Sequence, residues 1–579
     1  MRAPRRRRDT VLAYVLLGVA VAALLATWVG VRGLRARARL DAARAAVPAL
    51  EDALSSDRAS VPQRLAAIQR DTRAARRLTS DPVWTVLSHV PVLGRSLRTG
   101  AGLARATNDL ATETFPALDR VAAGLSLDAL RDATGRVRLD PMRAAEPDLI
   151  RVRDSLARTE RDVARLPSSL VASPVAHGRS ALLAQLRQVR GSVGTAALAA
   201  RVAPDMLGGS GVRRYFLAIL NNAEMRGSGG FLGAWGILEA DHGRLRLTGL
   251  GVAEQLRNTT PTPAKTMPPD FVTRYGRFSA DSWWTNGNLS PHFPDASEVW
   301  TALWQKTRGQ RLDGTIAIDP VALSGLLAVT GPTKLAGGEQ VTAANVVALT
   351  ERDAYVRFKD DGRARDLFLQ QVAVAVYQQL ASGNGDTVGL LTALADAAGT
   401  RHLQIASTHA SEQAVLETTP LGGVMPDTPG PYLEVTTVNA AGNKLDYYIT
   451  RAVRYERKKD GTGTVEVRLR NATPPGLPHY VSGRADLLPG QAAPPGQQHL
   501  YVSVFGALGS VLEEAEVDGT RRSVESELQR GHPVWSAYVN VDPGHELVLR
   551  LRLSQMPAGK PLVRQPPLVA NDTLIVKTG

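Results

Sequence analysis

The stretch Asp313–Pro332, "DGTIAIDPVALSGLLAVTGP", decides the fold class. Residues 315–318 form a short apolar run that is typical of a buried strand. Asp319 followed by Pro320 is a strong helix start, because the carboxylate can cap the first free N–H groups and proline fits the first turn. Gly331 then ends the helical pattern. A buried strand that leads directly into a helix predicts an α/β domain around this segment.

Sequence patterning divides the chain outside this stretch into further regions. Residues 32–205 carry apolar positions three and four apart, with Arg, Asp and Glu on the other faces, which predicts a membrane-proximal helical region or stalk. Strands and helices alternate over 206–430, the predicted α/β domain. Short β-branched runs separated by Gly, Pro, Asn and Asp fill 431–579, and their spacing predicts a β-sandwich. We therefore expect a multidomain α+β protein.

Two local predictions can be tested directly by a structure. The runs "FLGAWGILEA" and "GRLRLTGL" predict a hairpin with a three-residue connection at Asp241-His242-Gly243. The run "FPDASEVWTALWQKT" predicts a helix capped by Asp295, with Glu298 completing the capping-box spacing.

An apolar segment near the start of the chain predicts a membrane anchor. Residues 10–31 carry no charge and are flanked by arginines on both sides. Crossing hydrocarbon takes about 20 apolar residues, whereas the apolar part of a cleaved signal peptide has about 7–15. We expect an uncleaved signal anchor, a transmembrane helix over 11–31, after an Arg-rich cytoplasmic stub over 1–10. The predicted localisation is the cell membrane, single-pass, with the bulk of the chain extracytoplasmic.

Composition excludes several classes of function. The formal net charge is +14, but much of the excess flanks the apolar segment, and no basic patch interleaved with aromatic residues follows. Nucleic-acid binding is therefore not expected. The chain has no cysteine, which excludes disulfides, thiol catalysis and cysteine-based zinc sites. The ten histidines are scattered, and the motifs of serine hydrolases, P-loop proteins and zinc proteases are absent.

The segment "EMRGSGG" is the first candidate site. Arg226 is followed by three glycines and a serine, and a glycine-rich backbone can turn several N–H groups toward one anion. A forked guanidinium beside them suits phosphate or carboxylate. The alternative is a turn in which the glycines only permit positive φ and Arg226 pairs with Glu224.

The segment "AYVRFKDDGRARDLFL" is the second candidate. Arg357, Arg363 and Arg365 surround Asp360 and Asp361, and two of the arginines open a helix, where the dipole disfavours cations. A bound anion would offset that cost. The two carboxylates could hold Mg²⁺ against a phosphate, since magnesium prefers one or two carboxylates together with phosphate oxygens. Local pairing of the aspartates with the arginines is the alternative.

The segments "NNAEMRGSGGFLGAWGILEADHGRL", "NLSPHFPDASEVW", "DGTIAIDPVALSGLLAVTGP" and "NKLDYYITRAVRY" together resemble the membrane-anchored bacterial family called domain of unknown function 4012. The family is uncharacterised, so this resemblance implies a fold and no activity.

A more distant resemblance implies a function. "DGTIAIDPVALSGLLAVTGPTKLAGGEQVTAANVVAL" followed by "AYVRFKDDGRARDLFLQQV" is similar to the LytR-CpsA-Psr phosphotransferases, which transfer glycopolymers from polyprenyl-pyrophosphate lipids to peptidoglycan with Mg²⁺. The resemblance implies that Arg226, Arg357, Arg363 and Arg365 bind pyrophosphate and that Asp360 or Asp361 holds the metal. Arg226 is followed by Gly227 and Ser228, so the acidic ligand of that family's Arg-Ser-Asp motif is missing. A shared fold is therefore better supported than a shared reaction.

Two functions follow as expectations. The first is the binding, with or without transfer, of a polyprenyl-pyrophosphate-linked glycan in cell-envelope glycopolymer assembly; if the protein is an enzyme, it is a Mg²⁺-dependent phosphotransferase. The second is a non-catalytic envelope module or scaffold that binds wall polymer such as peptidoglycan, or partner proteins.

Overall fold

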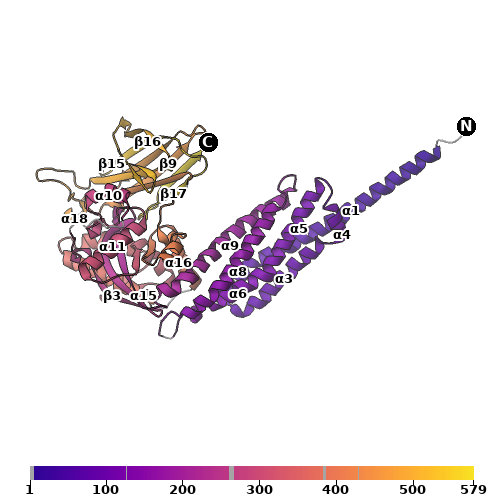
Figure 1. Cartoon of the computed structure of the whole chain (residues 1–579), viewed down its shortest axis with the longest axis horizontal. Coiled ribbons are helices and arrows are strands. Elements are labelled where there is room, and N and C mark those ends of the chain that lie inside the picture. Colours follow the sequence, from indigo (N-terminus) through magenta and orange to yellow (C-terminus); the bar gives the residue numbers. More distant parts are fainter. Residues whose placement is uncertain (1–4, 126, 133, 260–266, 382–386, 428) are drawn as a thin grey trace. The chain divides into compact units, whose positions relative to one another are not determined.

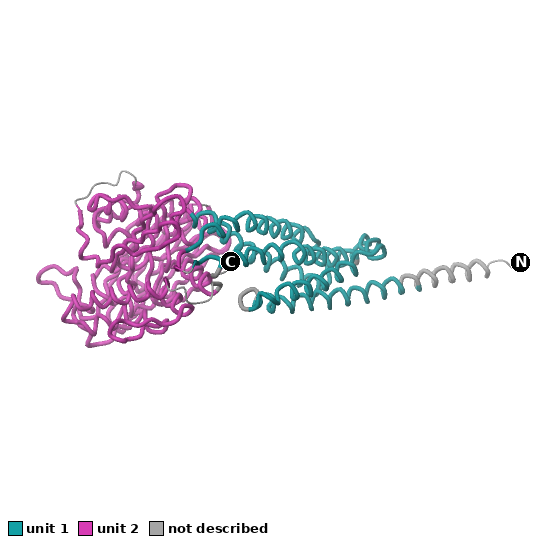
Figure 2. Tube along the Cα trace, turned by 90° about the horizontal axis from the view of Figure 1, so that it is seen from below, with its two compact units in different colours: residues 1–132, 137–204 teal, residues 133–136, 205–579 magenta. Residues whose placement is uncertain are grey.

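The computed structural model is a mixed α+β chain of two compact units (Figures 1 and 2). The residues it describes are 5–125, 127–132, 134–259, 267–381, 387–427 and 429–579. Unit 1 comprises residues 1–132 and 137–204 and is helical. Unit 2 comprises residues 133–136 and 205–579 and contains the large sheets.

Unit 1 is a bundle of long helices whose apolar faces point inward. In α8, Leu149, Val152 and Leu156 are buried at intervals of three and four residues, which places them on one face of the helix. They pack into one apolar core with residues of α5 and α9. The helices are α1 (Arg5–Ala45), α2 (Val47–Ser56), α3 (Val61–Leu78), α4 (Pro82–Leu87), α5 (Leu93–Asp109), α6 (Phe115–Gly124), α7 (Leu127–Leu130), α8 (Leu139–Arg165) and α9 (Ser173–Met206).

The predicted transmembrane helix over 11–31 is wrong. Within the described part of the chain, no helix has the length and apolar character needed to cross a membrane. The segment belongs to α1, which continues unbroken into an arginine-bearing half that packs against α3. There Arg32 pairs with Asp81 at 3.0 Å and Ala36 is buried in the bundle.

The predicted single-pass, extracytoplasmic localisation is contradicted by the same finding. Of the predicted stub over 1–10, residues 1–4 lie outside the described residues. The prediction relied on the number of uncharged residues in 10–31. It did not take into account that the same helix continues into a charged half that packs in the bundle.

The first sheet of unit 2 has the order β3-β2-β1-β4-β7. β1 and β4 are parallel and the other pairs are antiparallel, so the sheet is mixed. Its apolar sides are covered by separate cores, one built around Trp284 and Trp300 and others that involve α12. The strands are β1 (Arg213–Arg226), β2 (Gly229–Asp241), β3 (Arg244–Val252), β4 (Gly314–Ile318) and β7 (Leu403–Ser407).

Helices and short segments of unit 2 surround this sheet. They are α10 (Pro269–Tyr275), α11 (Phe293–Arg308), α12 (Pro320–Thr330), α13 (Val346–Ala348), the π-helix η6 (Leu349–Asp353), α14 (Ala354–Arg357), α15 (Gly362–Ala381), α16 (Thr387–Gly399), α17 (Ala410–Leu416) and the two-stranded β5 (Thr333–Lys334) and β6 (Gln340–Val341).

The strand and helix predicted from Asp313–Pro332 are confirmed. β4 leads into Asp319, whose carboxylate accepts hydrogen bonds from the N–H groups of Val321 and Ala322 at 3.0 and 3.1 Å. Gly331 follows the helix with φ 84°, a conformation that glycine adopts without steric cost.

The hairpin predicted between β2 and β3 is also present, but its loop has two residues. Asp241 pairs with Arg244, and His242 and Gly243 both have positive φ, as a type I′ turn requires. The capping role predicted for Asp295 is wrong. α11 begins two residues earlier, at Phe293, and Asp295 accepts a hydrogen bond from Ser290 at 2.6 Å.

The predicted β-sandwich is formed by two sheets that share one apolar core. Their orders are β13-β12-β16-β10-β9-β18 and β14-β15-β11-β8-β17. The strands are β8 (Tyr432–Asn439), β9 (Ile449–Arg457), β10 (Gly463–Asn471), β11 (Gln498–Phe505), β12 (Val511–Val517), β13 (Thr520–Arg521), β14 (Glu525–Gln529), β15 (His532–Val541), β16 (Glu546–Ser554), β17 (Leu562–Arg564) and β18 (Thr573–Thr578), with the short helix α18 (His479–Ser482) in a connection.

Candidate functional site

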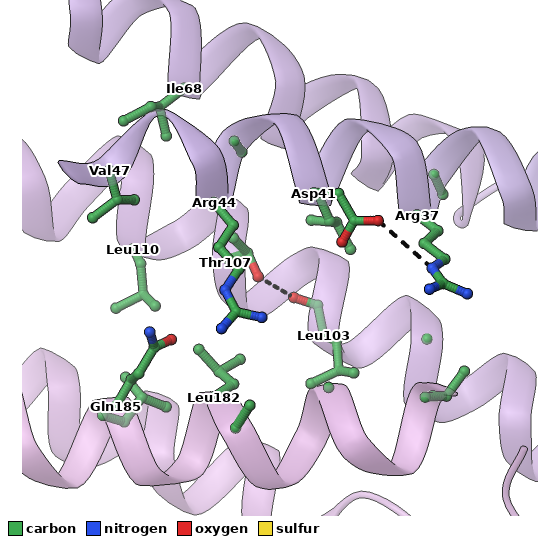
Figure 3. A pocket seen from close by; sticks show the side chains of 18 of the residues that line it. Arg37, Asp41, Arg44, Val47, Ile68, Leu103, Thr107, Leu110, Leu182 and Gln185 are labelled. Atoms are coloured by element: carbon green, nitrogen blue, oxygen red, sulfur yellow. Dashed lines mark hydrogen bonds and ion pairs between the residues drawn. The ribbon is translucent and has the colours of Figure 1, made fainter. Parts of the chain in front are cut away.

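A cavity of about 1510 Å³ lies inside unit 1 (Figure 3). Side chains from α1, α2, α3, α5, α6 and α9 are among those that form its walls. The lining is mainly apolar; among the residues drawn in the figure are Val47, Ile68, Leu103, Leu110 and Leu182.

The cavity exists because small residues occupy inward positions where a filled bundle would carry leucine. Gly33 and Ala36 of α1, Gly100 of α5, and Gly178 and Ala181 of α9 all line it. A side chain added at Gly33 or Gly178 would meet only ordinary contacts, at 3.6 and 3.7 Å. Glycine inside a helix costs about 1 kcal/mol relative to alanine, so its placement here favours open space over helix stability.

Charged side chains of α1 lie along the solvent-exposed side of this apolar space. Arg37 is paired with Asp41 at 3.6 Å. One turn further on, Arg44 extends from α1 toward the helix that carries Leu182 and Gln185 (Figure 3). The side chain of Arg44 forms no hydrogen bond or ion pair with another described residue. The cavity therefore has a long apolar lining, and Arg44 on its wall has no acidic partner among the described residues.

The size and chemistry of the cavity restrict what it can hold. Pockets for drug-sized ligands measure about 300–1,000 Å³, so this one suits a longer molecule. Because the lining is mainly apolar, burial of an apolar ligand against it is favoured. An elongated apolar chain with an anionic end matches both the lining and Arg44.

The first candidate predicted from sequence, Arg226, lies at the end of β1 inside unit 2. Its side chain is only 7% exposed. Its guanidinium donates to the carbonyl oxygens of Met225, Asn439 and Thr285 at 2.9 to 3.3 Å and to Glu224 at 2.8 Å. Every guanidinium nitrogen therefore has a protein acceptor.

Glu224 is held between two cations. One carboxylate oxygen accepts from Arg226, and the other contacts the ammonium group of the buried Lys444. Burial alone would raise the pKa of Glu224; Lys444 and Arg226 outweigh that effect and hold its pKa below the usual value. Arg226 was predicted to bind an anionic ligand, and Glu224 occupies the place of that anion. This pairing of Arg226 with Glu224 is the alternative given for this loop.

The arginines of the second candidate lie in different environments. Arg357 pairs with Glu339 at 2.7 Å and lies over the rings of Phe358 and Phe368. Arg363 is exposed. Arg365 is buried, bonded to the adjacent Asp366 at 3.0 Å.

Arg365 also lies over two tyrosine rings. Its guanidinium carbon is 4.5 Å from the ring centroid of Tyr480 and 5.3 Å from that of Tyr355. The two rings stack on each other at 6.1 Å, and a guanidinium beside them gains cation–π attraction and packing. This arrangement joins α15 to α18 and gives Arg365 a structural role within unit 2.

The predicted metal ligands are placed at the surface. Asp361 accepts a hydrogen bond from the N–H group of Ala364 at 2.9 Å and so caps α15. Asp360 is exposed, with Lys359 3.9 Å away. Throughout the described ranges, no three His, Asp or Glu side chains gather in a way that could hold a metal ion. The assignment of Mg²⁺ stays a prediction.

Sequence reasoning missed several buried acids of unit 2. Asp446 accepts hydrogen bonds from Met225, Asn439 and Gln498, and burial raises its pKa to about 7. Glu351 is buried on η6, and its burial raises its pKa well above the usual value. Nothing marks Glu351 in the sequence, because "ALTERDAYVRF" has the pattern of a solvent-facing helix.

Comparison with known proteins gives a family match for part of the chain. Residues 210–355 match the family model described as Protein of unknown function (DUF4012). This region contains β1 to β4, α12 and the Arg226 loop. Neither the curated proteins nor the solved structures include a match to the chain. The expected similarity to this family is supported over that region, while the resemblance to LytR-CpsA-Psr proteins stays a prediction.

Proposed function

We propose that this protein is a non-catalytic binding protein for a polyprenyl-phosphate-type lipid, whose apolar chain occupies the cavity of unit 1. The observation that carries the proposal is the apolar cavity of about 1510 Å³ together with Arg44 on its wall, which has no ion-pair partner among the described residues. A long isoprenoid chain would bury apolar surface along α1, α5 and α9, at about 25 cal/mol per Å².

The headgroup end of such a lipid is assigned to Arg44. A phosphate or pyrophosphate beside this guanidinium would form charge-assisted hydrogen bonds, which are about twice as strong as neutral ones. Binding of the lipid without transfer of its glycan is supported by Arg226 of unit 2. This arginine already has four protein acceptors, so it is not free to bind the pyrophosphate of a transfer reaction. A role in glycopolymer assembly rests on the LytR-CpsA-Psr resemblance alone.

The test is a titration of the full chain with polyprenyl monophosphate and pyrophosphate, each with and without Mg²⁺. Polyprenol and inorganic pyrophosphate serve as the chain-only and head-only probes. We expect the lipid phosphates to bind best, polyprenol to bind more weakly, and inorganic pyrophosphate not to bind. Arg44→Ala should bring the affinity for the phosphates down to that for polyprenol, a loss of about tenfold for one charge-assisted contact.

A matched pair of variants on α9 tests the location. Ala181 lines the cavity, whereas Ala184, three residues on, is exposed and does not. Ala181→Trp should fill the space and abolish binding, while Ala184→Trp should bind as the unmodified protein does. The proposal fails if no lipid phosphate binds, or if both tryptophan variants bind equally well.

A further inference from the structure

One sheet of the β-sandwich has an outer face that bears a row of aromatic rings. Along β11, Leu500, Val502 and Val504 point into the sandwich core. Because side chains alternate along a strand, His499, Tyr501 and Ser503 lie on the opposite face. The neighbouring β15 places Tyr538 directly opposite Tyr501.

The rings form a continuous series across this face. Phe278 contacts Tyr501 at 5.9 Å between ring centroids, and Tyr501 contacts Tyr538 at 4.7 Å. Tyr538 stacks on His499 at 5.3 Å with an angle of 12° between the rings. Tyr538 is 42% exposed, and its hydroxyl makes no hydrogen bond with any described residue. It is the ring of the series most available to a ligand.

The rest of this face is already covered within unit 2. Arg274 of α10 donates to Ser503 at 2.7 Å and to Ser536 at 3.0 Å. Among the described residues, the part of the face left uncovered is the end that carries Tyr538, His499 and the exposed Asn540. We refer to His499, Tyr501, Tyr538 and Asn540 as the aromatic platform.

Polar groups surround the aromatic platform, and their charges balance. Arg277 donates to Glu525, whose carboxylate also accepts from the hydroxyl of Tyr501 at 2.6 Å. On another side, Arg484 forms a two-pronged ion pair with Asp486 at 2.6 and 3.0 Å.

Asn540 connects this rim to the rings. Its amide oxygen accepts from Arg484 at 3.1 Å and lies 2.7 Å from Nδ1 of His499. Two cations and two carboxylates leave no net charge, so the rim offers oriented donors and acceptors without attraction for a polyanion.

We propose that the aromatic platform binds a neutral polysaccharide. The C–H face of a pyranose ring would lie on Tyr538, since aromatic faces are negative and attract such weakly positive hydrogens. Sugar hydroxyls would then exchange hydrogen bonds with Asn540, Asp486 and Glu525. This site is independent of the lipid cavity of unit 1, and it uses different residues and a different class of ligand.

Other ligand classes fit the platform less well. A lipid chain needs an enclosed apolar space, whereas Tyr538 is open to solvent and flanked by ion pairs. An acidic polymer would need a surplus of cations, and the rim has none. A proline-rich peptide can also stack on tyrosine, and displacement of the polysaccharide by such a peptide would contradict the proposal.

The experiment is affinity electrophoresis of the full chain in native gels that contain dextran, mannan, galactan or soluble starch. Polygalacturonate serves as an anionic polymer, and polyproline as a peptide competitor. The variants are Tyr538→Ala and Tyr538→Phe, with Tyr480→Ala as the control, because Tyr480 is a similarly exposed tyrosine (47%) on α18. Circular dichroism checks that each variant is folded.

We expect at least one neutral polysaccharide to retard the unmodified protein. Tyr538→Ala should weaken that affinity about tenfold, while Tyr538→Phe, which keeps the ring, should retain most of it. Tyr480→Ala should have no effect. If Tyr538→Ala fails to fold, Asn540→Ala at the rim replaces it and should weaken binding in the same way.

Retardation by no neutral polysaccharide, or only by polygalacturonate, would overturn the proposal. So would displacement of the polysaccharide by polyproline, or an equal loss in Tyr480→Ala. Because the probes are sugars without lipid, these failures are distinct from a failure of the cavity to bind lipid phosphates.

Discussion

Arg44 in unit 1 and Arg226 in unit 2 each lie at the end of a long element, α1 and β1, yet their surroundings are opposite. Arg226 is buried with an acceptor for every nitrogen, and its charge is neutralised by Glu224. Arg44 extends along a cavity without a partner among the residues that the structure describes. An arginine in a glycine-rich motif can therefore be structural, whereas an arginine on an ordinary helix face can be the one without an acidic partner among the described residues.

The largest effect should come from breaking the buried ion-pair cluster of Glu224, Arg226 and Lys444. Glu224→Ala would leave Arg226 and Lys444 buried without their shared carboxylate. Removing one partner of a buried ion pair costs about 3–5 kcal/mol, because the remaining charge is uncompensated. We expect the free energy of unfolding of unit 2 to fall by that amount, measured by urea denaturation.

Glu339→Ala is the matched control. It removes the carboxylate partner of Arg357, but both side chains are more than one third exposed. Exposed pairs contribute about 0–1 kcal/mol because solvent screens them. Equal destabilisation by Glu224→Ala and Glu339→Ala would contradict a structural role for the Arg226 cluster and reopen it as a ligand site.

A second test measures how stability depends on pH and concerns Asp446, which accepts a hydrogen bond from the N–H group of Met225, between Glu224 and Arg226. Burial raises the pKa of Asp446 to about 7. An acid with a raised pKa binds its proton more tightly in the folded than in the unfolded state. The free energy of unfolding should therefore fall as the pH rises from about 4 to about 7.

Asp446→Asn removes this titration. The Oε1 atom of Gln498 has no hydrogen-bond partner among the described residues, so a flip of that amide can receive the new Asn amide nitrogen. We expect the variant to gain on the order of 2 kcal/mol relative to the unmodified protein between pH 5 and pH 8. Urea midpoints measured at each pH would show it, and a difference independent of pH would refute the assignment.

Much of the local fold could be predicted from the sequence. The strand, cap and helix of Asp313–Pro332 follow from short-range chemistry, since the capping carboxylate lies within three residues of the N–H groups it binds. The sandwich strands were predictable from their alternation for the same reason. The membrane anchor was wrong because the role of α1 depends on helices far away in the sequence that pack against its second half.

The candidate site was harder to predict, since pairing across long sequence separations decides it. Glu224 and Arg226 are only two residues apart, but Lys444, which contacts the second carboxylate oxygen of Glu224, comes from more than two hundred residues away. The cavity likewise depends on glycines and alanines in α1, α5 and α9 that face one another only after folding. The residue pattern within one segment therefore predicts neither the pairing with Lys444 nor the cavity.

The smallest expected effect sharpens the contrast between the predicted arginines and Arg44. Arg363 is exposed at the start of α15, and its side chain forms no hydrogen bond or ion pair with any residue that the structure describes. Arg363→Ala should change the free energy of unfolding by less than about 0.5 kcal/mol, as surface substitutions usually do. Its affinity for polyprenyl pyrophosphate should equal that of the unmodified protein. A loss of affinity in Arg363→Ala together with normal affinity in Arg44→Ala would move the phosphate site from unit 1 to the arginine cluster of unit 2.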